Sequence, residues 1–203
     1  MISSKRQRLT GTILMAALSI GLLSGCADLP FSAAKASPSP TPTPSKTSVI
    51  TTIHNDLAAG STKRLLGAGA IALTVNYWSD LAMDQWTASA NKPISFSMVG
   101  TIDGDQGQAV YLSEVSAVLA VNGPDGPLTA PAPLDDRATI TPGYLVKSPY
   151  SYSQTFVLPA LDNRATSVTL SFTYQLLLQT TPTSSEYAKQ TASDSLTVAI
   201  AQP

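Results

Sequence analysis

The segment from residue 77 to residue 86 holds the side chains of this chain best suited to binding a ligand. It contains both tryptophans, Trp78 and Trp86, and two carboxylates, Asp80 and Asp84. Indole faces stack on sugars or cations, and carboxylates accept hydrogen bonds from the donors of such ligands. The segment therefore predicts a binding surface, with at least one indole partly exposed and the pair bordering a groove. The alternative is that the indoles plug the end of a folded domain.

The two carboxylates also raise the alternative of an enzyme that hydrolyses glycosidic bonds. Such an enzyme needs an acid and a base or nucleophile about 5 to 10 Å apart. Asp80 and Asp84 are close in sequence, but nothing around them marks either carboxylate as desolvated. The one histidine, His54, cannot form a metal site alone, and a catalytic triad would need Ser and acid partners supplied by the folded domain, so we interpret His54 as a solvated side chain. We therefore predict a non-catalytic protein without catalytic residues.

Metal and cofactor sites have little support in the sequence. Residues 103–108, with Asp103 and Asp105 around Gly104, resemble the opening of a calcium loop. Position six of the loop is Gln108, where an EF-hand needs glycine, so an ordinary polar turn is favoured and a weak Ca²⁺ site stays open. One cysteine cannot form a zinc site or a disulfide framework. We predict no metal and no cofactor.

The composition limits the possible partners. Among 203 residues, 12 Lys and Arg stand against 13 Asp and Glu, and charged residues make up only 12%. Nucleic-acid-binding domains show a basic excess, which this chain lacks. We therefore expect no nucleic-acid partner. The length suits one ordinary domain with additional segments.

The N-terminus has the pattern of a secretory leader. Three basic residues lie among residues 1–8, an uncharged apolar run extends from residue 12 to residue 23, and small residues follow. The apolar run is shorter than the roughly 20 residues that a transmembrane helix needs. We therefore predict a signal peptide over residues 1–25.

The end of this leader, Leu23-Ser24-Gly25-Cys26, resembles the lipobox of bacterial lipoproteins at all four positions. The resemblance implies that the thiol of Cys26 carries a diacylglycerol and that cleavage makes Cys26 the new N-terminus. Two or three long acyl chains anchor a protein far more firmly than one. We therefore expect a protein bound to the cell membrane through Cys26, on the outer, extracytoplasmic face. A plain secreted protein is the alternative.

A linker is predicted between this anchor and the folded domain. Residues 33–48 read AAKASPSPTPTPSKTS, with proline at every second position from 38 to 44. Such a sequence favours an extended polyproline II spacer and supplies no core. Residues 47–64 are ambiguous between a short helix and an irregular segment. We assign residues 26–64 to the lipidated N-terminus, linker and lead-in, and residues 65–203 to the domain.

Residues 65–203 alternate between apolar and polar side chains with a period of two, which is typical of half-buried strands. The clearest run has its large apolar side chains at the even positions from Val168 to Leu178. In the run from Val110 to Val121 the apolar parity changes near Glu114, which indicates a β-bulge or a strand that passes between sheets. Further candidate strands cover residues 71–77, 93–98, 150–158 and 196–200. The pattern predicts an all-β, immunoglobulin-like antiparallel β-sandwich of about seven strands.

Together these features predict a membrane-anchored extracytoplasmic lipoprotein that displays a non-catalytic β-sandwich. We expect it to bind an unknown protein or an envelope component. Two alternatives remain: an envelope enzyme that acts on wall glycan through Asp80 and Asp84, and a structural accessory of a membrane complex.

Overall fold

The structure, a computed structural model, describes residues 52–202, which form ten β-strands and one short 3-10 helix. The elements are β1 (Ser61–Ala68), β2 (Ile71–Trp78), η1 (Met83–Gln85), β3 (Lys92–Ile102), β4 (Val110–Gly123), β5 (Gly126–Leu128), β6 (Leu134–Arg137), β7 (Tyr144–Leu145), β8 (Tyr152–Leu158), β9 (Ser167–Gln179) and β10 (Tyr187–Ala199). Seven of these strands have seven residues or more.

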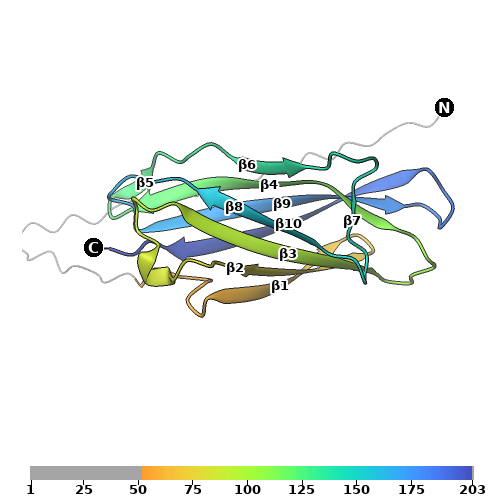
Figure 1. The fold of residues 1–203 in the computed structure, drawn as a ribbon, viewed down its shortest axis with the longest axis horizontal. Helices are drawn as coiled ribbons and strands as arrows, with labels where there is room; N and C mark the ends of the chain where they lie inside the picture. Colours follow the sequence, from red (N-terminus) through yellow and green to blue (C-terminus); the bar gives the residue numbers. More distant parts are fainter. Residues whose placement is uncertain (1–51, 203) are drawn as a thin grey trace, which may run out of the picture. The chain divides into compact units, whose positions relative to one another are not determined.

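The strands form two sheets that face each other (Figure 1). One sheet has the order β1-β2-β3-β8, and the other has the order β10-β9-β4-β5, with β6 and β7 also paired to β4. Every pairing between these strands is antiparallel. The predicted all-β antiparallel architecture is confirmed.

The predicted alternation places the apolar side chains between the sheets. In β9 the even positions from Val168 to Leu176 are buried, and Ser171 between them is exposed. The ring of Phe172 lies 5.2 Å from that of Tyr77 and 5.5 Å from that of Phe96, so side chains of both sheets meet at the centre of the core. Aromatic pairs at such distances stabilise a core beyond the area that they bury.

The change of parity in β4 is a β-bulge. The register between β4 and β9 shifts between Leu112 and Glu114, so Ser113 has no partner residue on β9. The hydroxyl of Ser113 donates to the carbonyl oxygen of Gln175 instead. Because one extra residue reverses the parity, Leu112 and Val115 are both buried.

The folded part extends N-terminally of Leu65, where we had placed the start of the domain. Strand β1 begins at Ser61, and Leu57 is fully buried in the core. The sequence of β1 does not show the alternation of apolar and polar side chains. Arg64 faces inward and forms ion pairs there, while Leu65 is 79% exposed on the outer face.

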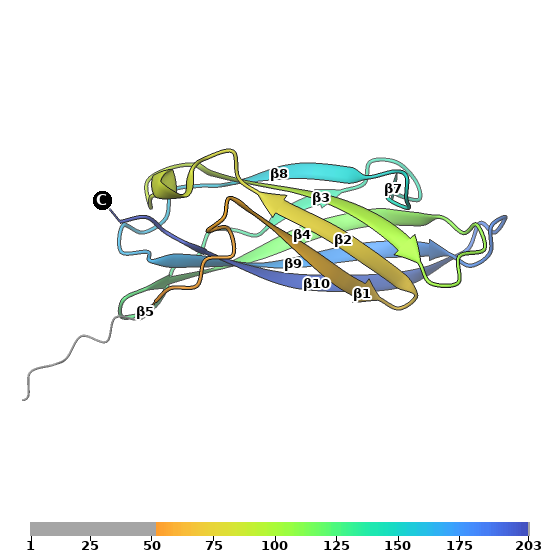
Figure 2. The same ribbon diagram turned by 90° about the horizontal axis from the view of Figure 1, so that it is seen from below.

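The register places two groups of loops at opposite ends of the sandwich (Figure 2). We call one the proximal end: it contains residues 79–91, 159–166 and 200–202 and the start of β1. The other, the distal end, contains residues 103–109, 138–151 and 180–186. The described chain begins beside the proximal end, since the backbone N–H of Asp56 donates to the carbonyl oxygen of Thr197 near the end of β10.

The signal peptide, Cys26 and the proline-rich linker lie outside the described residues. Within residues 52–202, no helix has the length and hydropathy needed to cross a bilayer.

Candidate functional site

Trp86 belongs to the core and not to a binding surface. Its side chain is fully buried, and its indole Nε1–H donates to Ser79 Oγ at 3.0 Å. The Ser79 hydroxyl in turn donates to the carbonyl oxygen of Pro93 at 2.7 Å, which ties the β2–β3 connection to β3. The backbone N–H of Ala201 donates to the carbonyl oxygen of Trp86. The indole therefore plugs the proximal end, and its predicted place at the border of a groove is wrong.

The other three residues of the predicted surface lie outside the core. Trp78 has the outward parity of β2 and is partly exposed on the outer face of the four-stranded sheet, between Ser61 and Ser95. Asp80 and Asp84 are exposed to solvent. A glycosidase acid needs a desolvated setting, which the surroundings of these carboxylates do not supply. Partial exposure of one of the two indoles was predicted, and Trp78 has it.

A buried lysine, which the sequence analysis did not single out, holds the proximal end together. Lys92 is fully buried at the start of β3. Its ammonium donates to four main-chain carbonyl oxygens: those of Thr87, Ala88 and Ala90 at 3.2, 3.2 and 2.6 Å, and that of Pro159 at 3.1 Å. An ammonium has three donors, so these bonds are shared among the acceptors.

The cage of carbonyl oxygens explains how Lys92 is buried although no carboxylate among residues 52–202 forms an ion pair with it. Burial lowers the pKa of the Lys92 amine below its usual value. The four carbonyl dipoles replace the lost water, and the ammonium satisfies oxygens that would otherwise be unpaired. The sequence did contain a signal for this burial: in the period-two alternation of the strand, Lys92 falls on the same face as the buried Ile94 and Phe96.

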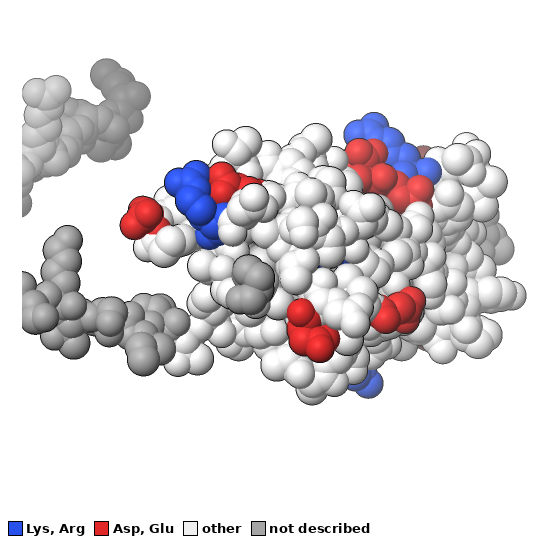
Figure 3. Space-filling view, turned by 60° about the vertical axis from the view of Figure 1, so that its left-hand side comes forward, with Lys and Arg blue, Asp and Glu red and all other residues white. Residues whose placement is uncertain are grey.

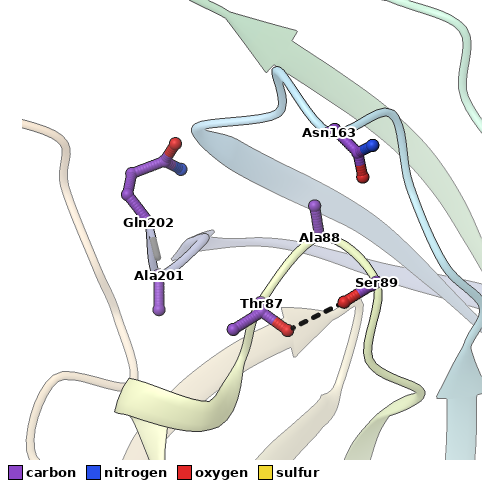
Figure 4. Close-up of a pocket in the computed structure, with 6 residues that line it drawn as sticks. All are labelled: Thr87, Ala88, Ser89, Asn163, Ala201 and Gln202. Atoms are coloured by element: carbon purple, nitrogen blue, oxygen red, sulfur yellow. Dashed lines mark hydrogen bonds between the residues drawn. The ribbon is translucent and has the colours of Figure 1, made fainter.

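A small cavity of about 190 Å³ lies beside this cage (Figure 4). Neutral side chains line it: the hydroxyls of Thr87 and Ser89, the amides of Asn163 and Gln202, and the methyl groups of Ala88 and Ala201. Gln202, the last residue that the structure describes, lines the cavity together with Ala201. Figure 3, which turns this side of the molecule forward, shows charged side chains only in small separate groups.

Polar groups also connect the sheets along the edge formed by β1 and β10. Asp56 accepts hydrogen bonds from Arg64 Nη2 at 2.5 Å and from the backbone N–H of Thr197 at 2.7 Å. Burial alone would raise the pKa of Asp56, but the bonds from Thr197, His54 and Arg64 outweigh it and hold the pKa below the usual value. The His54 ring is 77% exposed, in agreement with a solvated histidine.

Next to this edge, two tyrosines meet inside the core. The hydroxyls of Tyr77 and Tyr174 lie 2.7 Å apart. Burial raises the pKa of Tyr77, and the neighbouring Tyr174 and Asp194 raise it further. Both phenols therefore stay neutral and act as a structural pair between the sheets.

At the distal end lie residues 103–108, for which the sequence favoured a polar turn and left a weak calcium site open. Asp105 Oδ1 forms an ion pair with Lys147 Nζ at 2.7 Å and accepts the backbone N–H of Gly107 at 2.8 Å. The bond from Lys147 lowers the pKa of Asp105. Within residues 52–202, no group of three or more His, Cys, Asp or Glu side chains is placed to hold a metal ion. Lys147 thus occupies the position of a cation next to Asp105.

Lys147 also belongs to a segment that joins both sheets at this end. The backbone N–H of Val146 donates to the carbonyl oxygen of Val110 in β4, and that of Ser148 donates to Gly100 in β3. Two large apolar side chains are exposed nearby, Ile140 and Tyr150, each at 58%. The distal end therefore presents exposed apolar side chains on a fixed backbone.

No protein-family model matches this chain, and no curated protein matches it.

Proposed function

We propose that the chain is a lipoprotein held on the outer face of the cell membrane by a diacylglycerol on Cys26, and that it displays a non-catalytic, immunoglobulin-like binding module. The lipobox resemblance at Leu23-Ser24-Gly25-Cys26 supports the anchor. The bound partner is a protein or an envelope component.

The strand order supports an immunoglobulin-like arrangement. Immunoglobulin domains have strands A, B and E in one sheet and strands G, F and C in the other. The orders β2-β3-β8 and β10-β9-β4 follow this arrangement, with β1 added outside β2. In this assignment, residues 103–109 form the B–C loop and residues 180–186 form the F–G loop.

One observation carries the proposed function. A fold that began with β2 would start at the distal end, but the preceding strand β1 runs antiparallel to β2, so the chain enters at the proximal end. Strand β1 pairs with β2 from Ser61 at that end to Ala68 at the other. The B–C and F–G loops lie at the distal end, which is the end that binds ligands in antibody variable domains. An N-terminal anchor therefore leaves these loops at the end remote from the point of attachment.

The exposed side chains of the distal end suit a binding surface. Tyrosine is enriched in interfaces, and exposed apolar patches mark interaction sites. Ile140 and Tyr150 supply such side chains there. Trp78 lies on the outer face of a sheet near the proximal end, and it is not part of this surface.

The anchor is tested by the substitution Cys26→Ser. We expect the protein to leave the membrane fraction or to accumulate as an unprocessed precursor, because the chain has no other thiol. Fractionation of cells followed by detergent phase partitioning measures this. Mature Cys26→Ser protein that still partitions into detergent would show that acylation is not the anchor.

The binding surface is tested by site-specific photo-crosslinking in intact cells. A photoreactive residue replaces Ile140 at the distal end or, as a matched control, the exposed Ser89 at the proximal end. We expect a defined crosslinked product from position 140 and none from position 89. Equal products from both positions, or a product from position 89 alone, would contradict the assignment of the distal end.

A further inference from the structure

Three loops converge at the distal end and hold one another in place. Lys147 Nζ donates to Asp105 Oδ1 and to the carbonyl oxygen of Gln108, each at 2.7 Å. A Cβ atom at Gly107 would lie 3.5 Å from Pro182, so the B–C and F–G loops are in contact. A recess of about 230 Å³, which we call the distal recess, is lined by residues 107–109 of the B–C loop and by side chains between Leu145 and Tyr150.

The distal recess combines an aromatic side chain with hydrogen-bonding groups. Tyr150 and Leu145 supply its apolar wall, and Gln108, Lys147 and Ser148 supply polar groups. Lys147 uses two of its three N–H donors within the protein. The amide oxygen of Gln108 accepts the backbone N–H of Gln106, which leaves the amide NH₂ group directed to other acceptors.

The charge of the distal recess is balanced. Lys147 forms an ion pair with Asp105 at 2.7 Å, and the hydrogen bond from Lys147 lowers the pKa of the Asp105 carboxyl. Lys147 is the one charged side chain that lines the recess, and its pairing with the neighbouring Asp105 offsets its charge while its remaining N–H can still donate. Its volume is below the range of about 300–1,000 Å³ typical of pockets for drug-sized ligands, which suits one small ring.

We propose that the distal recess binds one sugar ring of an uncharged glycan, with the ring stacked on Tyr150 and its hydroxyls bonded to Lys147, Gln108 and Ser148. A pyranose has an apolar C–H face and a rim of hydroxyls that both donate and accept. Both halves of this ligand thus match the lining, whereas a peptide side chain of either charge gains nothing from a neutral recess. This inference rests on the proposed function, and it names the class of envelope component.

The inference is tested by calorimetry with three defined probes: N-acetylchitotetraose, cellotetraose and mannotetraose. The whole chain is used, purified in detergent. We expect at least one probe to bind with a dissociation constant on the order of 1 mM, which corresponds to about −4 kcal/mol. Absence of binding by all three probes at tenfold higher concentration would overturn the inference.

Three variants locate the binding. Tyr150→Ala removes the stacking ring, and we expect at least a tenfold loss of affinity. Tyr150→Phe keeps the ring, so the affinity should stay within about threefold of the original chain. Val157→Ala changes a similarly exposed apolar side chain of β8 that does not line the recess and is not part of the proposed binding surface, and it should leave the affinity unchanged. Full binding by Tyr150→Ala, or an equal loss in Val157→Ala, would contradict the placement of the ring.

The crosslinking experiment separates failure of this inference from failure of the proposed function. A defined protein crosslinked from position 140, together with no binding of the three glycans, would overturn the sugar site and leave the proposed function standing. Absence of a crosslink together with absence of glycan binding would overturn both the sugar site and the proposed function.

Discussion

Replacement of Trp86 by alanine tests whether the indole is a structural plug. Trp86 is fully buried and donates its Nε1–H to Ser79. Truncation of a buried Trp to Ala costs about 3 to 5 kcal/mol, because a large apolar side chain is lost and a cavity remains. Ser79 keeps its bonds to Pro93 and Leu81, so no buried hydroxyl is left unpaired. We therefore expect Trp86→Ala to lower the free energy of unfolding by about 4 kcal/mol, out of a total of about 5 to 15 kcal/mol.

Thermal and urea unfolding followed by circular dichroism measure this loss. For a domain of this size, each kcal/mol lowers Tm by about 2 to 4 °C, so a decrease of roughly 8 to 16 °C is expected. Trp78→Ala is the matched control: its indole is partly exposed on the outer face, and we expect a loss of about 1 kcal/mol. In a Trp78→Phe variant, the remaining emission of Trp86 should be blue-shifted and resistant to acrylamide.

Two results would refute the reasoning about Trp86. One is a Trp86→Ala variant that is no less stable than Trp78→Ala. The other is efficient acrylamide quenching of Trp86 in the folded Trp78→Phe protein. Either result would show that the Trp86 indole is exposed on the surface and is not part of the core.

Three further predictions concern the proximal end and the edge of the sandwich. Lys92→Met should lower the free energy of unfolding, measured by urea titration, by about 2 to 3 kcal/mol, because buried carbonyl oxygens lose their donor. A variant as stable as the original chain would show that the cage contributes nothing to stability. Asp56→Asn should reduce stability at pH 7. Since the pKa of Asp56 is lowered by folding, its contribution is present above about pH 4 and is lost as the pH falls through the folded value. The original chain should therefore lose stability on acidification below pH 4 more steeply than Asp56→Asn, and identical pH profiles would contradict this. A chain that starts at residue 65 should unfold at lower urea concentration than one that starts at residue 52, because it lacks Leu57 and half of β1; equal midpoints would show that the lead-in is dispensable.

The strands and the core followed from the sequence because burial of one face imposes a period of two on each strand separately. The apolar positions of β2 and β9 repeat with this period, and the change of parity near Glu114 marked the bulge. Such patterns need only neighbouring residues. Strand β1 lacks the pattern because its inward Arg64 is neutralised by Asp56 and Asp194, and one of these partners is distant in sequence.

The functional surface required the tertiary structure, because its residues come from loops that are far apart in the sequence. Nothing near Asp105 in the sequence indicates Lys147, which is 42 residues away and forms an ion pair with it. Similarly, one of the four carbonyl oxygens around Lys92 belongs to Pro159, which follows β8 and is 67 residues away in the sequence. The sequence by itself determined which side chains face inward along each strand and, through the pattern around Cys26, the expected anchor. Only the packing of the two sheets decided which end is plugged by Trp86 and which end presents Tyr150, since the register between distant strands sets which loops meet.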